Sequence, residues 1–396
     1  MHRLCGGAVG LSHVRDQLTR AAYASFAFWG WFLYAFGPAV PLIRDDQGTS
    51  RAVAGLHGTA LALGTILSAS ISVPLVHRFQ RRGTLVGATA LAAVGVVVLV
   101  VGPGPAVTLL GALLTGVGGG VVLNAVNPVL SDHHGPVAPA AISEANALAA
   151  GCGIVAPLAV GLGVDLGLTW RAAILVSLPL AALSIVLVLR APLVPALVEE
   201  QRPQEGPRSP LGRPFWLALG LVVAAVGMEF CTTFWGSELL RSRDGLSPGA
   251  ASAGVSALLA GMTLGRLAAV PLSRRFSSRH ILLATLALTG AGWATFWLAR
   301  SAPLALTGLV LLGFGLAFSY PIGVVLLMQG SGGRPDTAIA LAGLGVGVAS
   351  GSAPFALGAM ADRVGTHNGF LLVPALLVVA VACVLLARPA AGRAQP

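Results

Sequence analysis

The chain has 396 residues, of which 56% are hydrophobic and only 10% are charged, whereas about a quarter of the residues in a soluble protein are charged. The net charge of +10 comes from arginine alone, because the sequence contains no lysine. This composition excludes an ordinary soluble protein, and the lack of lysine excludes a Walker-type phosphate loop and lysine Schiff-base chemistry. Long apolar runs rich in glycine and alanine instead predict a helical membrane protein.

The first half of the chain is predicted to hold six membrane-spanning helices after a polar tail. Residues 1–20 lack an apolar region followed by a small-residue cleavage site, so we expect a cytoplasmic tail rather than a signal peptide. The apolar runs that follow are long enough to cross about 30 Å of hydrocarbon. They form a predicted N-terminal bundle over residues 21–190, with spans at 21–43, 52–76, 84–102, 105–130, 138–164 and 169–190.

The second half repeats this organisation after a linker. Residues 191–213 are rich in proline and charge and form the predicted cytoplasmic linker. A C-terminal bundle over residues 214–388 follows, with spans at 214–239, 250–273, 280–299, 303–328, 336–361 and 368–388, and residues 389–396 form a cytoplasmic tail. The predicted fold class is therefore an all-α membrane protein with twelve transmembrane helices.

The arginines are distributed unevenly between the two sides of the predicted membrane. With both termini in the cytoplasm, sixteen arginines fall in cytoplasmic segments and seven in outer loops. Cytoplasmic loops of membrane proteins carry such a basic excess, so this orientation is predicted. The same distribution accounts for the positive charge without a nucleic-acid partner.

The two halves of the sequence are related by an offset of 197 residues. VPLVHRFQRR at residues 73–82 recurs as VPLSRRFSSR at residues 270–279. Further residues recur at the same offset: Gly111, Gly116, Gly118, Pro157, Gly161 and Asp165 correspond to Gly308, Gly313, Gly315, Pro354, Gly358 and Asp362. The offset predicts two parallel six-helix repeats, with a solute site at their interface that faces each side of the membrane in turn. We expect Asp165 and Asp362, at outer helix ends, to be solvated loop charges.

The loop after the second helix of each repeat resembles a motif of the major facilitator superfamily of secondary transporters. That family typically carries Gly-x-x-x-Asp-Arg-x-Gly-Arg-Arg in this loop. The residues that match the two copies are Arg78, Arg81, Arg82, Arg275 and Arg279. His77 and Arg274 stand where the family has aspartate, so the chain departs from the family's pattern at both positions. The resemblance implies that His77 and the matching arginines act in gating loops; alternatively, the arginines only orient the helices in the membrane.

Two signatures of proton-driven drug exporters in that superfamily are incomplete here. Ala112 stands where those exporters have an arginine in the fourth helix, and only Pro157 and Gly161 match their motif in the fifth. These departures weigh against drug export. The segment GMTLGR at residues 261–266 is similar, over a short length, to fucose-type sugar–proton symporters. The sequence leaves uptake by symport and export by antiport open.

Acidic residues inside the spans are candidates for proton coupling. Glu229 lies about fifteen residues into the seventh span, near the middle of the membrane, where a charge costs at least about 2.5–3.5 kcal/mol. We expect Glu229 to exchange the coupling proton or to bind substrate; the alternative is a structural ion pair with Arg266 on the next helix. Glu144, near the cytoplasmic end of the fifth span, is the second proton-coupling candidate, or else a solvated acid at a helix start.

The resemblance also implies which helices line the solute site, namely the first, fourth, seventh and tenth. Polar and aromatic residues on these helices are the substrate-binding candidates: Tyr34, Asn124, Asn127, Thr232, Thr233, Trp235, Ser319 and Tyr320. For each of them the alternative is a helix–helix hydrogen bond or an aromatic residue at the membrane interface.

The predicted function is secondary active transport of a small organic solute by alternating access, coupled to protons. Proton-antiport efflux of drugs or metabolites is the alternative. A membrane-embedded enzyme or a channel is disfavoured, because the sequence has no HExxH or GxSxG motif and no selectivity-filter signature. The four cysteines show no metal-binding or redox spacing, so we expect no metal or other cofactor. We expect a monomer in the lipid bilayer of a bacterial plasma membrane.

Overall fold

The computed structural model describes residues 15–192 and 211–387, and all regular elements in these ranges are helices. Most of the predicted N-terminal tail, linker and C-terminal tail lies outside the described residues. In the described part, nine helical segments are long and apolar enough to cross a membrane. Two of these, Arg51–Val101 and Pro105–Asp165, contain 51 and 61 residues, well beyond the roughly 20 residues that one crossing needs.

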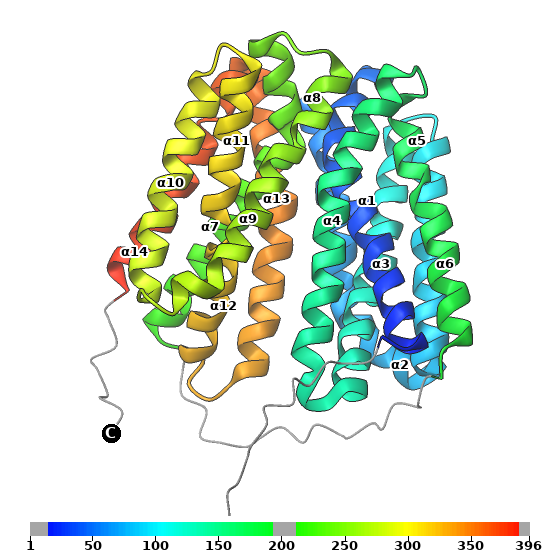
Figure 1. The fold of residues 1–396 in the computed structure, drawn as a ribbon. Helices are drawn as coiled ribbons and strands as arrows, with labels where there is room; N and C mark the ends of the chain where they lie inside the picture. Colours follow the sequence, from blue (N-terminus) through cyan, green and yellow to red (C-terminus); the bar gives the residue numbers. More distant parts are fainter. Residues whose placement is uncertain (1–14, 193–210, 388–396) are drawn as a thin grey trace, which may run out of the picture.

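The helices form two groups that lie side by side (Figure 1). The first group consists of α1 (Gln17–Gln47), α2 (Arg51–Val101), α3 (Pro105–His134), the 3-10 helix η1 (Gly135–Val137), α4 (Ala138–Asp165), α5 (Thr169–Leu175) and α6 (Ser177–Arg190). The second group consists of α7 (Arg213–Asp244), α8 (Pro248–Gly254), α9 (Ser256–Ser273), α10 (Ser278–Leu298), α11 (Ala302–Leu316), α12 (Ser319–Gln329), α13 (Pro335–Gly369) and α14 (Leu372–Leu386).

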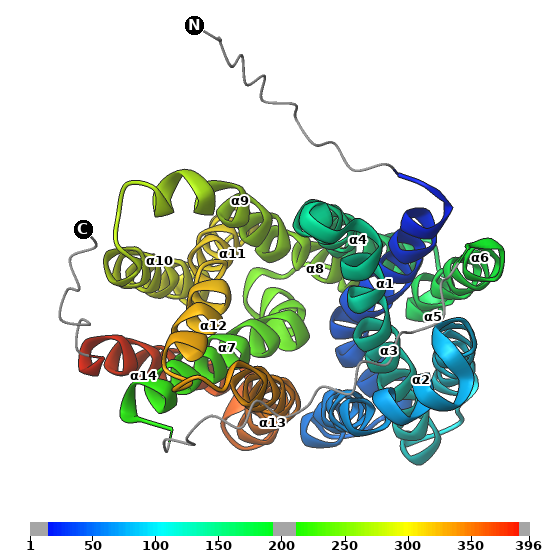
Figure 2. The same ribbon diagram turned by 90° about the horizontal axis from the view of Figure 1, so that it is seen from below.

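We call the boundary between the two groups the seam. The start of α1, the end of α6, the start of α7 and the end of α14 lie at the lower end of the bundle in Figure 1, which we call the terminal end. The view along the helices in Figure 2 places α13 beside the first part of α2, and α4 beside α8 and α9. Hydrogen bonds cross the seam from Thr59 Oγ1 to the Gly351 carbonyl and from Ser256 Oγ to the Ile154 carbonyl, both at 2.7 Å.

Several predicted spans differ from the helices in where they break. The second and third spans are merged in α2, which bends at Gln80, where φ is +58°. The predicted eighth span is divided between α8 and α9, and the tenth between α11 and α12. The eleventh span extends beyond its predicted end at residue 361 to Gly369, with a break at Gly365, whose φ of +81° a residue without a Cβ adopts readily.

Glycines make equivalent close helix contacts in both groups. A Cβ added at Gly116 would lie 2.2 Å from the Leu61 carbonyl oxygen, and one added at Gly313 would lie 2.0 Å from that of Leu258. Leu61 and Leu258 are themselves 197 residues apart. A second pair of contacts keeps this offset. Gly111 packs on the backbone of Leu99, and its counterpart Gly308 packs on the backbone of Phe296. The offset found in the sequence is thus also an offset in helix packing.

Candidate functional site

At the seam, α1 and α7 approach each other through a glycine. A Cβ on Gly37 would lie 2.8 Å from the Thr233 methyl group. The Thr233 hydroxyl donates to the Glu229 backbone carbonyl at 2.8 Å, which leaves the methyl directed at α1. Tyr34 and Glu229 lie one helical turn before Gly37 and Thr233, so each shares the seam-facing side of its helix.

Arg266 reaches the same place from α9. Gly261 and Gly265 pack that helix against α11, where a Cβ on either would come within 2.7 Å of a backbone oxygen. Arg266 is the next residue, about 100° further round the helix, and it interacts with the Tyr34 hydroxyl across the seam. The Tyr34 ring packs against Gly153 of α4.

Glu229 and Arg266 attract each other electrostatically without forming an ion pair. Among the described residues, the Glu229 side chain has no hydrogen-bond partner. Tyr320 on α12 also interacts electrostatically with Glu229, and its side chain is 48% exposed. We call Tyr34, Glu229, Arg266 and Tyr320 the seam cluster. The alternative of a direct structural ion pair between Glu229 and Arg266 is therefore not what the structure has; the two side chains interact at longer range.

Other residues predicted to bind substrate lie inside one helix group and already have partners. Trp235 is fully buried, and its indole N–H donates to the Pro354 carbonyl at 2.8 Å. Thr232 is also buried and donates to the Met228 carbonyl of its own helix. Packing of α7 against α13 therefore accounts for Trp235, and neither residue joins the seam cluster.

Three remaining substrate-binding candidates lie on α3 and α12. Asn124 donates to the hydroxyls of Ser68 and Ser72, at 3.3 and 3.1 Å, which ties α3 to α2. Asn127 is exposed and donates to a carbonyl of its own helix. Ser319 is buried, and its hydroxyl has no partner within the described residues. The structure does not bring these three into the seam cluster.

Glu144 lies at the terminal end of α4, away from the seam cluster. Its carboxylate accepts two hydrogen bonds of 2.9 Å from Arg15 and one of 2.8 Å from the Tyr23 hydroxyl. These hydrogen bonds raise the pKa of Arg15. Glu144 thus connects the beginnings of α1 and α4, and its carboxylate is held by Arg15 and Tyr23 rather than by solvent alone.

A second polar contact reinforces this connection at Asp16. Its carboxylate caps α1 by accepting from the Thr19 N–H, and it lies 2.7 Å from His133 Nε2 at the end of α3. Partial burial works to raise the pKa of Asp16, but the hydrogen bonds from Thr19 and His133 outweigh it and lower the pKa. Asp16 and Glu144 together hold the terminal ends of α1, α3 and α4.

The repeated loop arginines bind helix ends within their own group. Arg82 donates to the Ala191 carbonyl at 2.7 Å, just after α6, and Arg279 donates to the Ala387 carbonyl at 3.1 Å, just after α14. Arg81 forms an ion pair with Asp132. Cations are favourable at helix C-termini, where carbonyl groups lack partners.

The other predicted gating residues are exposed. His77, Arg78 and Arg275 lie on the surface of the terminal end, and Arg78 stands over the Phe79 ring at 5.9 Å. Within the described residues, none of the three has an ion-pair partner.

Sequence reasoning missed a network of charges that joins the two groups at the other end of the bundle. Glu238 on α7 accepts from Arg44 at 2.7 Å and from Arg51 at 2.9 Å, and its side chain is only 7% exposed. Arg241 pairs with Asp45 at 2.7 Å. We call these five residues, together with Asp362, the latch. The sequence signal available was only the presence of both charge signs near the outer ends of the first and seventh spans.

Asp362 corrects one expectation directly. Rather than being a solvated loop charge, its carboxylate accepts from the backbone N–H groups of Arg51 at 2.9 Å and Ala52 at 2.8 Å, at the start of α2 across the seam. An acid is stabilised at a helix N-terminus by its free N–H groups. Its counterpart Asp165 lies against Gly249 at the start of α8, so the repeat extends to the seam.

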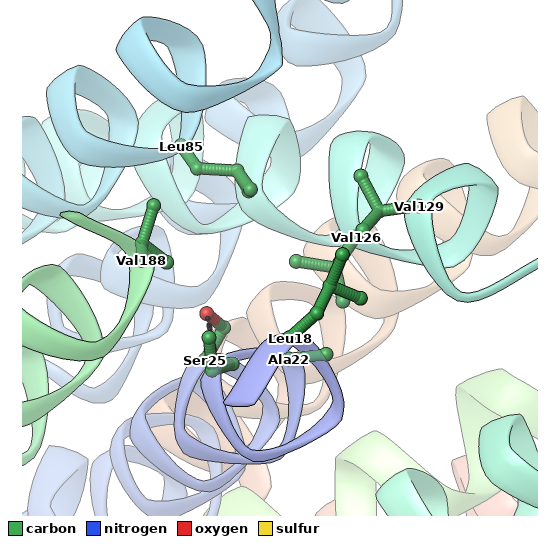
Figure 3. A pocket seen from close by; sticks show the side chains of 8 residues that line it. Leu18, Ala22, Ser25, Leu85, Val126, Val129 and Val188 are labelled. Carbon is green, nitrogen blue, oxygen red and sulfur yellow. Dashed lines mark hydrogen bonds between the residues drawn. The ribbon is translucent and has the colours of Figure 1, made fainter. Parts of the chain in front are cut away.

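An apolar pocket inside the first group is unsuited to polar chemistry (Figure 3). It is lined by side chains from α1, α2, α3 and α6, and its only polar lining residue is Ser25. The Ser25 hydroxyl is already hydrogen-bonded to that of Ser184 at 2.8 Å. Elsewhere in the described ranges, no cluster of three His, Cys, Asp or Glu residues is placed to hold a metal ion.

Comparison with known proteins gives a family and a fold. The sequence matches the family described as Major Facilitator Superfamily over residues 22–268 and again over 217–396. No curated protein matches it.

Several solved structures share the fold at low sequence identity. The chain is similar to a variant of the nucleoside transporter NupG, with a TM-score of 0.78 and 14% identity over 94% of this chain and 99% of that one. It is also similar to a D-xylose–proton symporter, with a TM-score of 0.76 and 14% identity over 94% and 98%. The chain is also similar to a bacterial homologue of the human lysosomal transporter Spinster in an inward-facing and occupied conformation. The TM-score is 0.71 and the identity is 16%, over 94% of this chain and 95% of that one.

Proposed function

Because the chain belongs to the major facilitator superfamily of membrane transporters, we propose that it moves a small organic solute across the plasma membrane by proton-coupled alternating access. The observation that supports this proposal is the seam cluster, in which the acidic residue Glu229 and the basic residue Arg266 lie between the two helix groups. The chain would act as a monomer with both termini in the cytoplasm.

Two parallel six-helix repeats provide the moving parts in this proposal. The two longest apolar segments would each cross the membrane twice, and α14, which is apolar but shorter, would cross once, which brings the number of spans to twelve. The equivalent glycine contacts at an offset of 197 residues support a duplicated unit. Related bundles that meet at a seam can rock about a central site.

The latch fits a state that is closed to the outside. With the terminal end in the cytoplasm, as the arginine distribution predicts, the latch lies at the outer end of the seam. All the ion pairs that join the two groups within the described residues belong to it. Alternating access then requires these pairs to separate when the outer end opens.

Glu229 is the proposed proton-coupling residue. Its carboxyl group lies midway along α7, lacks a hydrogen-bond partner among the described residues, and is attracted by Arg266. Protonation removes a charge that is costly within the membrane, while deprotonation is balanced by the nearby guanidinium. Tyr34, Thr233 and Tyr320 are the neighbouring residues proposed to contact the solute.

Substituting Glu229 tests proton coupling. A thermal-shift screen of sugars, organic acids, amino acids and hydrophobic cations first identifies a stabilising solute. In proteoliposomes, Glu229→Gln is expected to lose accumulation of that solute driven by a pH gradient while it retains solute exchange, because the amide cannot carry the proton.

Glu144→Gln is the matched control for this experiment. It removes the other predicted proton-coupling carboxyl group but leaves the seam cluster intact, so gradient-driven accumulation is expected to continue. Accumulation by Glu229→Gln at the unsubstituted rate would refute the coupling role. Imposing the gradient in each direction separates uptake by symport from export by antiport.

A further inference from the structure

Arg266 is a cation within the seam that lacks a carboxylate in direct contact. Its side chain is exposed rather than packed, and it interacts with the neutral Tyr34 hydroxyl. Glu229 is near enough to attract it but does not pair with it. In the described part of the chain, no acidic residue forms an ion pair with Arg266.

The surrounding helices direct Arg266 to the seam rather than to lipid. The two preceding glycine contacts fix α9 against α11, and Tyr34 belongs to the opposite helix group. Tyr34 also packs against a cluster that includes Leu259 and Met262 of α9. The guanidinium therefore lies between the groups, where a transported solute would pass.

An exposed arginine in this position is suited to bind an anion. A charged side chain within a membrane protein is costly unless it faces water or pairs with an opposite charge. Arginine presents a planar fork of N–H groups that matches a carboxylate through two parallel hydrogen bonds. Because Glu229 does not occupy this fork directly, a carboxylate on the solute can do so.

We propose that the transported solute is a small organic acid, bound as its carboxylate anion by Arg266 together with the Tyr34 and Tyr320 hydroxyls. This inference rests on the proposed transport function and deepens it. The Tyr34 hydroxyl supplies a neutral donor beside the guanidinium, and Tyr320 lies on the Glu229 side of the cluster. The exposed ring of Tyr320 supplies an apolar surface for the body of the solute.

The same arrangement links the solute to the proton. The carboxylates of the solute and of Glu229 compete for one guanidinium, with Tyr34 and Tyr320 as the other titratable groups facing Glu229. When a proton from solution neutralises Glu229, Arg266 is free to hold the solute. When Glu229 releases that proton, its negative charge returns next to Arg266 and the solute is expelled.

Matched acids and amides test the proposal on the purified full chain in detergent. Succinate, lactate and benzoate are each compared with succinamide, lactamide and benzamide by thermal shift. At least one acid is expected to raise the Tm by about 2–4 °C near saturation, while its amide leaves the Tm unchanged.

Substitutions then locate the binding. Arg266→Gln is expected to weaken binding of the active acid about 10- to 100-fold, since a hydrogen-bonded charge is lost. Arg266→Lys, which keeps the charge but not the fork, is expected to lie in between. Tyr34→Phe is expected to weaken binding about fivefold. Arg243→Gln, at an exposed arginine outside the seam, serves as the control.

Three results would overturn the proposal: no acid shifts the Tm, the amides shift it as much as the acids, or Arg266→Gln binds the acid as tightly as the unsubstituted chain. If Arg266→Gln fails to give a monodisperse protein, Arg266→Lys is measured in its place, and binding of the acid as tight as in the unsubstituted chain would then overturn the proposal. Binding in detergent involves no gradient, so these results are distinct from a failure of proton coupling, which only Glu229→Gln in proteoliposomes reveals.

Discussion

The arginines of this chain differ in function according to what each guanidinium contacts. Arg82 and Arg279 bind carbonyl groups at helix ends, Arg44 and Arg51 bind Glu238 across the seam, and Arg266 faces Tyr34 within it. The first two kinds have a partner inside the protein. Of these five arginines, Arg266 alone contacts no carbonyl or carboxylate group of the described residues directly.

The helix-end contacts predict unequal effects of substituting the loop arginines. Arg82→Gln and Arg279→Gln are each expected to destabilise the protein by about 1 kcal/mol, because a charged donor to a helix C-terminus is lost. Arg78→Gln is the control, since this exposed side chain stands over the Phe79 ring and has no ion-pair partner among the described residues. Thermal unfolding in detergent measures all three. Equal Tm values for Arg82→Gln and Arg78→Gln would contradict the capping role.

Single residues were predicted from sequence only where an unusual environment marked them. An acid and an arginine inside apolar runs are rare, so Glu229 and Arg266 stood out, and the structure places them near each other. Asp362 was predicted to be a solvated loop charge and Glu238 was not singled out, because their partners lie 311 and 194 residues away. Trp235 looked like a binding residue because sequence cannot show that Pro354 accepts its N–H.

At the scale of helices, glycine determines how closely neighbours pack. The backbones of α2 and α3 touch at Gly116, and those of α9 and α11 touch at Gly313. Small residues at such positions allow close helix contact in membranes, where the hydrophobic effect does not drive association. These contacts keep the offset of 197 residues that the sequence pattern predicts.

Adding one methyl group at these contacts is expected to destabilise both repeats similarly. Gly116→Ala and Gly313→Ala place a Cβ against a backbone oxygen that cannot move independently, so each is expected to cost about 1–3 kcal/mol. Gly87→Ala is the matched control, because nothing lies within 4 Å of its added Cβ and alanine favours a helix by about 0.5–1 kcal/mol. A lower Tm for Gly87→Ala than for Gly116→Ala would contradict this account of the packing.

Helix breaks were harder to predict than helices. Runs of apolar residues marked every spanning segment, since their length is set by the bilayer. The bend at Gln80 has no glycine or proline at the residue itself, and the division between α8 and α9 falls in an apolar run. Such breaks depend on contacts with neighbouring helices, which a sequence pattern does not contain.

For the whole molecule, polar contacts join the two helix groups at one end of the seam. The latch forms this connection opposite the terminal end, with ion pairs and with the Asp362 cap on α2. Glu238 is almost buried between two arginines. Removal of its charge leaves Arg44 with Asp45 and Arg51 with Asp362 as remaining partners, so the loss is expected to be below about 3–5 kcal/mol, which is typical of a buried charge left uncompensated. A change of a few kcal/mol shifts the populations of two conformations of similar free energy substantially.

The central claim is that the two helix groups rock about the seam, and it is tested most directly by measuring distances at both ends in liposomes. Spin labels are attached after Ser131→Cys and Met328→Cys at the terminal end, or after Gly104→Cys and Ser301→Cys at the opposite end, in a chain whose four cysteines are replaced by alanine. Double electron–electron resonance is then compared with and without Glu238→Gln. The account predicts that Glu238→Gln lengthens the 104–301 distance and shortens the 131–328 distance. Distances that stay constant, or that change in the same direction at both ends, would contradict it.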